Sequence, residues 1–400
     1  MTKDFIALTD RYIAATYARY PIALVRGEGC MVWDSEGKKY CDFVSGLAVN
    51  NLGHSHPRII EAIRRQAGEL IHVSNLYHIP QQTELARMLV ENSFADKVFF
   101  CNSGAEANEA AIKLTRRYHN DRGKGDRYEI ITMTNSFHGR TMATITATGQ
   151  EKFHKGFEPL VPGFKYVPFN DLSATEAALT KNTCAVMVEP IQGEGGVNLP
   201  AEGYLKGLRE MCDAHNLLLI FDEVQTGIGR TGELFAYENY GVIPDIMTLA
   251  KSLGGGVAIG AMLAKGNIIK SFIPGTHAAT FGGNPLACSA GIAALKAIME
   301  EGIISNCKRV GAYFIEKLTG LKEKYSFILD IRGKGLMIGL ELDFPGKDIT
   351  ITCMEKGFLI NCTMENVLRF LPPLIIGERE VDQLIDILDG IFMGKVPKVS

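Results

Sequence analysis

Short apolar runs alternate with stretches of helical periodicity through the middle of the chain. The apolar runs are Lys97–Cys101, Glu129–Met133, Cys184–Val188, Leu217–Phe221, Met247–Ala250 and Val257–Leu263. Helical patterns occupy Glu106–Tyr118, after the first run, and Gly203–His215, after the third. Strands buried on both faces read as continuous apolar runs, and intervening helices make successive strands parallel. The pattern therefore predicts an α/β fold with a mostly parallel sheet between helical layers.

The two ends of the chain follow a different pattern. Pro57–His72 reads as an amphipathic helix whose apolar face carries Ile59, Ile60, Ile63 and Ala67. Later, a helical pattern over Pro285–Glu301 leads to a second helix, strands at Gly335–Leu342 and Gly357–Cys362, and a closing helix. The closing helix spaces its apolar residues by three and four positions, at Val381, Leu384, Ile385 and Leu388. We expect residues 57–290 to form the large domain, residues 291–400 a smaller α+β domain, and residues 1–56 a segment that joins the small domain.

Composition and charge restrict the classes of function. A chain of 400 residues, 46% hydrophobic and 22% charged, can bury a large core without a metal or disulfide staple. A net charge of −3 gives no field that would gather nucleic acid or anionic lipid. The nine cysteines form no C-x-x-C, which indicates reduced thiols. The N-terminus lacks a signal-peptide pattern, and the longest uncharged stretch, Ser271–Leu295, contains prolines. We expect a cytoplasmic protein without a membrane span.

The segment Cys101–Glu106 combines a helix start with a candidate anion site. Ser103 and Glu106 form an S-x-x-E capping box directly after an apolar run. Free N–H groups at a helix start, with Gly104 permitting close approach, can bind an anion. The alternative is a capped helix that binds no ligand.

Two further segments place ionisable residues at the ends of apolar runs. Asp222 and Glu223 follow one run, where open α/β sheets bind ligands. They could instead bind a metal or cap a turn, but no H-E-x-x-H pattern or Cys/His set accompanies them, and we expect no metal. Lys251 follows another run, where partial burial would lower its pKa and suit Schiff-base chemistry, unless it is an exposed loop lysine. The glycines after Lys251 match neither G-x-G-x-x-G nor a P-loop, which argues against a nicotinamide or ATP site.

The three segments together match the anchors of pyridoxal 5'-phosphate. A helix start can hold the phosphate, an acid keeps the pyridine nitrogen protonated, and a lysine carries the aldehyde. Longer motifs accompany them: SGLAVNNLGHSHP (45–57), FFCNSGAEANEAAIKL (99–114), NSFHGRT (135–141), EPIQGEGG (189–196), FDEVQTGIGRTGELFAYE (221–238), TLAKSLGGG (248–256), THAATFGGNP (276–285) and LRFLPPL (368–374). From Tyr17 to about Phe392 the chain resembles the class III aminotransferases of fold type I, and within them the acetylornithine aminotransferase group. The resemblance implies a seven-stranded, mostly parallel sheet in a large pyridoxal-phosphate-binding domain.

The resemblance also implies a role for each matching residue around the cofactor. Lys251 would be the Schiff-base lysine and the base that moves the substrate proton, and Asp222 would pair with the pyridine nitrogen. Gln225 would lie near the ring hydroxyl, Val224 against one ring face and Phe137 against the other. The residues implied for the phosphate are Ser103, Gly104 and Ala105. Thr280 would reach the phosphate of a partner subunit, which implies a homodimer with shared active sites.

The implied substrate residues are two arginines and one acid. Arg140 would bind the carboxylate remote from the reacting amine, Arg369 the α-carboxylate of glutamate or 2-oxoglutarate, and Glu194 would neutralise Arg369 when the other substrate binds. Surface salt bridges are the alternative for all three. Two arginines and a carboxylate that can withdraw allow one pocket to accept two unlike amino donors in turn, because an unused arginine would otherwise be left without a partner.

These roles imply an ω-aminotransferase that moves the δ-amino group of N-acetylornithine to 2-oxoglutarate in arginine biosynthesis. Leu47 stands where the ornithine group has tyrosine, which favours an acylated donor over free ornithine. Succinylornithine, N-succinyl-diaminopimelate and 4-aminobutyrate remain alternative donors. An aminomutase or a non-catalytic binding protein on the same fold are alternatives from other classes. Ala258 departs from the family, in which many members have proline at this position.

Overall fold

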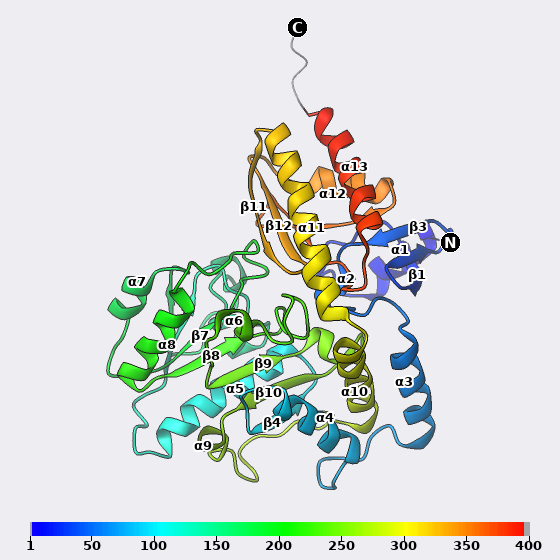
Figure 1. Ribbon diagram of the computed structural model, residues 1–400. Helices are drawn as coiled ribbons and strands as arrows, with labels where there is room; N and C mark the ends of the chain where they lie inside the picture. The colour runs from blue at the N-terminus through cyan, green and yellow to red at the C-terminus, as the bar shows by residue number, and fades with distance from the viewer. Residues whose placement is uncertain (1, 396–400) are drawn as a thin grey trace.

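A seven-stranded sheet forms the centre of the computed structural model, which describes residues 2–395 (Figure 1). Its strands are, in spatial order, β4 (Lys97–Cys101), β10 (Gly260–Ala264), β9 (Ile246–Leu249), β8 (Leu218–Asp222), β7 (Thr183–Val188), β5 (Glu129–Met133) and β6 (Phe164–Val167). Strand β10 runs antiparallel to both of its neighbours, and every other adjacent pair is parallel. The predicted mostly parallel sheet is confirmed.

Helices cover both faces of this sheet, which explains why its strands are apolar throughout. Along β8, Leu218 and Ile220 belong to one core cluster with residues of α5 (Gly104–Asn120). Leu219 and Phe221 belong to a second cluster with residues of α8 (Tyr204–His215). Successive side chains of a strand point to opposite faces, so a strand between two helical layers buries all of them.

The other helices around the large sheet are either shorter than α5 and α8 or lie at the edge of the sheet. They are α2 (Ser45–Ala48), α3 (Pro57–Glu69), α4 (Pro80–Glu91), α6 (Met142–Ala147), α7 (Leu172–Ala177), α9 (Gly266–Ile269) and α10 (Pro285–Glu300). Helix α10 packs against α3 and α4, which belong to the expected large domain. It continues to Glu300, past the domain boundary expected at residue 290. The proposed domain boundaries stay predictions.

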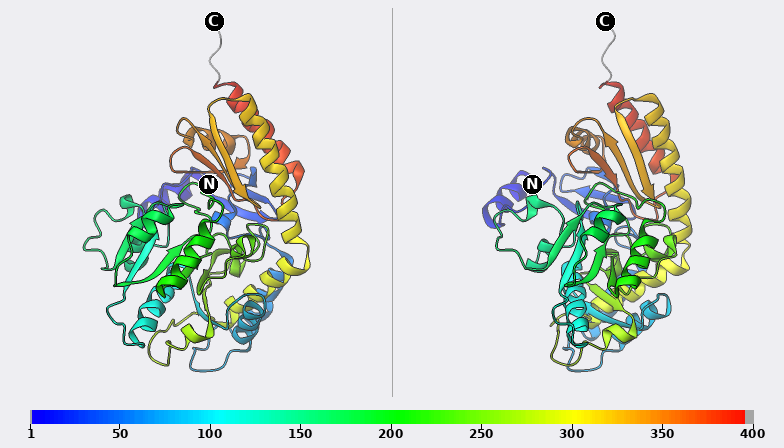
Figure 2. Two further views of the ribbon diagram at one scale, coloured as in Figure 1. Left: turned by 60° about the vertical axis from the view of Figure 1, so that its left-hand side comes forward. Right: turned by 90° about the vertical axis from the view of Figure 1, so that its left-hand side faces the viewer.

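The N-terminal and C-terminal parts of the chain form two smaller four-stranded sheets. One joins β1 (Leu24–Glu28), β2 (Met31–Asp34) and β3 (Lys39–Asp42) to β13 (Phe358–Leu359), so the N-terminal segment pairs directly with the C-terminal part. The other has the order β11 (Ile328–Lys334), β12 (Met337–Leu342), β15 (Val367–Phe370) and β14 (Asn361–Thr363). Figure 2 shows α11 (Ile303–Lys324) along this second sheet, with α13 (Glu378–Met393) beside it and α12 (Lys347–Glu355) nearby.

Two strand predictions differ from the structure, and other strands were not predicted. The predicted strand Gly357–Cys362 is two strands, β13 and β14, because the chain passes from one small sheet to the other at the buried Ile360. The run predicted from Val257 begins as a strand only at Gly260, because residues 257–259 continue the loop in which Gly255 and Gly256 have positive φ angles. Strands β1, β2, β3, β6, β11 and β15 were not predicted, since their sequences mix apolar and charged residues.

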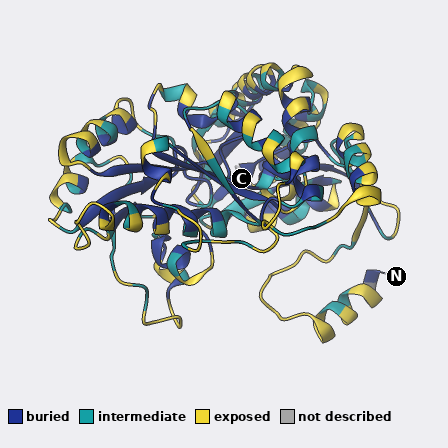
Figure 3. Cartoon of the chain, turned by 90° about the horizontal axis from the view of Figure 1, so that it is seen from below, coloured by how far each residue is buried: buried dark blue, intermediate teal, exposed yellow. Residues whose placement is uncertain are grey.

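The N-terminal helix α1 (Thr2–Tyr12) lies at the periphery of the molecule, followed by an extended segment (Figure 3), and its first residue, Thr2, forms a hydrogen bond with the Ser35 hydroxyl. It and the segment after it expose large apolar side chains, including Leu8, Tyr12 and Tyr17. Within residues 2–395, none of the helices combines the length and apolar character that a membrane span requires.

Candidate active site

The strand ends of the central sheet surround a cavity of about 430 Å³. Strands β4, β5, β7, β8 and β9 all run in the same direction, so their carboxyl ends lie along one edge of the sheet. The cavity is lined by a residue at or shortly after each of these ends: Ser103, Phe137, Glu189, Asp222 and Lys251. Open α/β sheets bind their ligands at this edge.

The start of α5 forms one wall of the cavity. Ser103 is the N-cap, and its hydroxyl accepts a hydrogen bond from the Glu106 N–H at 3.2 Å. The Glu106 carboxylate accepts from the N–H of Asn102 at 2.6 Å, one residue earlier than in a standard capping box. A Cβ on Gly104 would lie 2.7 Å from Val224 Cγ1, so only glycine lets Val224 approach this closely. The first N–H groups of a helix lack acceptors within the helix, which makes this wall suitable for a phosphate.

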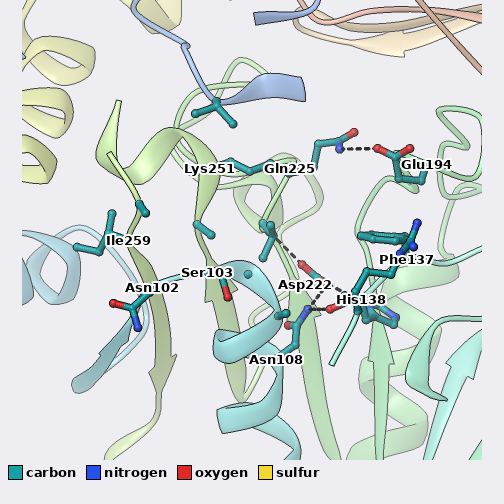
Figure 4. Close-up of a pocket in the computed structure, with 18 of the residues that line it drawn as sticks. Asn102, Ser103, Asn108, Phe137, His138, Glu194, Asp222, Gln225, Lys251 and Ile259 are labelled. Atoms are coloured by element: carbon teal, nitrogen blue, oxygen red, sulfur yellow. Dashed lines mark hydrogen bonds and ion pairs between the residues drawn. The ribbon is translucent and has the colours of Figure 1, made fainter. Parts of the chain in front are cut away.

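Asp222 lies at the centre of a buried hydrogen-bond network (Figure 4). Its Oδ2 accepts from Asn108 Nδ2 at 2.7 Å and lies 2.8 Å from His138 Nδ1, and its Oδ1 accepts from the Val224 N–H at 3.0 Å. Thr248 donates to Asn108 Oδ1 at 2.7 Å and so fixes the orientation of the amide. These three contacts fix the position of the Asp222 carboxylate, which can then form a charge-assisted hydrogen bond with a protonated ring nitrogen.

Lys251 is a buried lysine with a strained backbone. Burial lowers the pKa of its ammonium, Glu194 opposes this effect, and the positive charge of Arg369 adds to it. Its φ angle of 45° lies in the left-handed region, which is uncommon for residues other than glycine and is frequent at functional sites. A lysine whose pKa is lowered supplies a free amine more readily, which is what covalent attachment of an aldehyde requires.

Glu194 and Arg369 form an ion pair at one end of the cavity. Arg369 Nη1 donates to Glu194 Oε1 at 2.8 Å and to Gln225 Oε1 at 3.3 Å. Burial raises the pKa of Glu194, but Arg369 and Lys251 outweigh it and hold the pKa at about 2. Glu194 and Gln225 line the cavity, whereas Arg369, 1% exposed, lies behind them. A ligand carboxylate therefore reaches Arg369 only when Glu194 withdraws.

All the predicted site residues except Thr280 and Arg369 line the cavity. Arg369 still belongs to the site, because it contacts Glu194 from behind the cavity wall. Arg140 lines the cavity mouth, with its guanidinium carbon 4.1 Å from the ring centroid of Phe153. Thr280 instead lines a separate hollow with Phe99 and Leu76. Leu47 also lies outside the cavity lining, which Val49 of the same segment reaches.

Sequence reasoning missed four polar residues around the site. Asn108, His138 and Thr248 form the network at Asp222, and Glu189 accepts from the N–H groups of Phe137 at 3.1 Å and Gly193 at 3.3 Å. Burial and the charge of Asp222 raise the pKa of Glu189 to about 7, although His138 acts in the opposite direction. The available signal was the position of all four residues inside four of the long motifs.

These residues fit pyridoxal 5'-phosphate. The helix start at Gly104 offers unpaired N–H groups for a phosphate, Asp222 offers a hydrogen-bonded carboxylate, and the desolvated Lys251 offers an amine. Comparisons with known proteins agree. A sequence profile of the family described as Aminotransferase class-III matches residues 12–392.

Two similar sequences are acetylornithine aminotransferases. The protein of Caldanaerobacter subterraneus subsp. tengcongensis is 57% identical over 97% of this chain and 98% of its own length. That of Methanocaldococcus jannaschii is 54% identical over 98% of both chains.

Solved structures with the same fold include an ornithine aminotransferase from Toxoplasma gondii, with a TM-score of 0.95 and 37% identity over 98% of this chain and 95% of that one. An acetylornithine aminotransferase from Elizabethkingia anophelis gives a TM-score of 0.88 at 37% identity, covering 98% and 99% of the two chains. A second Toxoplasma gondii structure is described as having partial occupancy of PLP at its active site. The chain belongs to the class III aminotransferases, pyridoxal-phosphate-dependent enzymes of fold type I.

Proposed function

We propose that this enzyme transfers the δ-amino group of N-acetylornithine to 2-oxoglutarate, giving N-acetylglutamate 5-semialdehyde and glutamate, a step of arginine biosynthesis. The observation that carries the proposal is the ion pair between Glu194, which lines the cavity, and the buried Arg369. The names of the similar acetylornithine aminotransferases support the choice of donor.

Each cofactor contact is assigned to a residue of the cavity. The N–H groups at Gly104 and Ala105, with the Ser103 hydroxyl, would hold the phosphate. Asp222 would hold a proton on the pyridine nitrogen, and Val224 and Phe137 would pack on the two ring faces, with Gln225 near the ring hydroxyl. When bound, the cofactor supplies an electron sink for cleavage at the substrate carbon. Lys251 would hold the aldehyde and, once released from it, move the proton.

The substrate residues account for two unlike donors in one pocket. Glutamate carries a carboxylate beside its reacting amine, and this group would displace Glu194 and bind Arg369. N-acetylornithine has no carboxylate beside its δ-amine, so Glu194 would remain on Arg369 and keep a buried cation paired. Arg140, at the cavity mouth, would bind the carboxylate remote from the reacting amine in both cases.

We also propose that the protein is a cytoplasmic homodimer in which Thr280 reaches the partner subunit's phosphate. Thr280 lines a hollow outside the active-site cavity of its own chain. Leu76, which lines the same hollow, is 86% exposed. Large exposed apolar side chains that gather in one patch mark association surfaces. Nearby Tyr77 and Phe281 are also more than half exposed, at 64% and 59%. The scattered thiols agree with a reducing compartment.

A donor comparison tests the proposal. Enzyme reconstituted with cofactor is assayed with N-acetylornithine, succinylornithine, N-succinyl-diaminopimelate, 4-aminobutyrate and ornithine, each with 2-oxoglutarate. We expect the highest kcat/KM for N-acetylornithine. A higher value for another donor overturns the assignment of substrate, and turnover without 2-oxoglutarate would indicate an aminomutase instead.

A further inference from the structure

Arg369 has two sets of partners that differ in charge and in freedom to move. On one side, Asn361 Oδ1 accepts from Arg369 Nε at 3.1 Å and from Nη2 at 2.8 Å. On the other side, Nη1 donates to Glu194 and, more weakly, to Gln225. Among residues 2–395, Glu194 is the only carboxylate that pairs with Arg369. Every other side-chain partner of this guanidinium is a neutral amide.

Asn361 is the fixed member of this set. Residues 361 and 369 face each other across the antiparallel pair β14 and β15, so the contact is built into the sheet register. Glu194 lies on a loop, and its side chain is 28% exposed, against 1% for Arg369. A cross-strand partner stays in place when a loop residue withdraws. Asn361 therefore keeps the Nε–Nη2 edge of Arg369 occupied and leaves Nη1 directed toward the cavity side.

The neutrality of residue 361 has a consequence for specificity. When Glu194 withdraws, a buried cation without a counterion remains, and such a cation strongly favours an incoming carboxylate. An aspartate at position 361 could make the same two contacts but would neutralise Arg369 permanently. The carboxylate of glutamate would then meet a cation that is already paired.

We propose that Asn361 is a positioning and specificity-determining residue: its neutral amide orients Arg369 while leaving the cation's charge available to the α-carboxylate of glutamate or 2-oxoglutarate. This inference rests on the proposed function, since it concerns the half-reaction in which Glu194 withdraws. Asn361 acts through Arg369 and touches neither the cofactor nor the reacting atoms.

The main test compares Asn361→Asp with the wild type in the two half-reactions, each followed in a single turnover. The glutamate half-reaction should lose tenfold or more in kcat/KM, while the N-acetylornithine half-reaction should change less than about threefold. Asn366→Asp is the matched control. Asn366 belongs to the same hairpin, and its amide donates to the Leu342 carbonyl at 2.7 Å, away from Arg369. This control should keep the wild-type ratio of the two half-reactions.

A rescue experiment separates charge from structural damage. Glu194→Ala alone should impair the N-acetylornithine half-reaction, because it leaves Arg369 unpaired. Adding Asn361→Asp to that variant should restore this half-reaction, because the new carboxylate takes over the pairing, while the glutamate half-reaction becomes slow. A merely structural role for Asn361 predicts further loss in both half-reactions and no rescue.

Binding provides a readout that needs no turnover. Glutarate carries two carboxylates and no amine, and Asn361→Asp should weaken its binding about tenfold in calorimetric titration. Equal affinity for glutarate, or an equal fall in both half-reactions, overturns the inference. If the wild type reacts with glutamate but not with N-acetylornithine, the proposed donor is wrong, and the glutamate and glutarate comparisons still decide the role of Asn361.

Discussion

Glu189 accepts a hydrogen bond from the backbone N–H of Phe137 at 3.1 Å, which ties the end of β7 to the loop that follows β5. The other oxygen of the same carboxyl accepts from the Gly193 N–H at 3.3 Å, one residue before Glu194. One buried side chain thus holds both the aromatic wall of the cavity and the loop that carries the acid on Arg369. We expect it to affect activity without contacting the substrate.

The raised pKa of Glu189 predicts a specific dependence of stability on pH. The pKa of this group rises from an ordinary 4.5 to about 7 in the folded protein. Below the lower value the carboxyl is protonated in both the folded and the unfolded chain. Between the two values only the unfolded chain ionises, so the folded state loses stability as the pH rises, and the loss is complete above about 7.

Glu189→Gln should remove this dependence. In protein freed of cofactor, the melting temperature of the wild type should fall relative to that of the variant between pH 5 and pH 7, the interval spanned by the pKa shift. Gln also loses one acceptor, so kcat should drop about tenfold. Glu194→Gln is the control, because the pKa of Glu194 is about 2 and stays outside this interval. Parallel melting curves for Glu189→Gln and the wild type would contradict the assignment.

Lys251→Ala should abolish turnover, with a loss of about a thousandfold or more, because it removes both the amine that holds the aldehyde and the proton carrier. The variant should still bind the cofactor through the helix start at Gly104. In the wild type, borohydride treatment followed by peptide mapping should find a pyridoxyl group on Lys251. Recovery of that group on another lysine would refute the role of Lys251.

The apolar strands of the central sheet and the helix start at Ser103 follow directly from the sequence, because burial on both faces and helix capping are local patterns. The contacts of Asp222 do not, since Asn108 and His138 meet it only after α5 and the loop after β5 reach the same sheet edge. Asn361 was missed for a related reason. Its contact depends on the register of β14 with β15, and the apolar run containing it reads as one strand although it is divided between two sheets.

Thr280→Ala should weaken cofactor binding about tenfold, the effect of one lost hydrogen bond to a phosphate, without lowering the melting temperature of the cofactor-free protein. The reason is the position of Thr280 outside its own cavity, in a hollow with exposed apolar neighbours. Sedimentation and cofactor titration check this together. A fully active wild-type monomer would rule out the shared site.

The last prediction concerns the acid that shields Arg369. Its low pKa, about 2, means that Glu194 is ionised at every pH at which the enzyme is assayed. Glu194→Ala leaves Arg369 without a counterion when N-acetylornithine reacts. The carboxylate of N-acetylornithine is then drawn toward Arg369, and the substrate binds in an unproductive orientation. Glutamate needs no shield, because its α-carboxylate supplies the missing charge.

We therefore expect Glu194→Ala to lower kcat/KM for N-acetylornithine by tenfold or more relative to that for glutamate, since about 1.4 kcal/mol corresponds to a factor of ten. Single-turnover measurement of both half-reactions gives this ratio directly. Glu194→Gln, which retains a side chain of the same size, should behave like Glu194→Ala if charge is responsible and like the wild type if only volume matters. An equal fall in both half-reactions would mean that Glu194 supports the loop between Gly193 and Gly196 and has no part in the choice between donors.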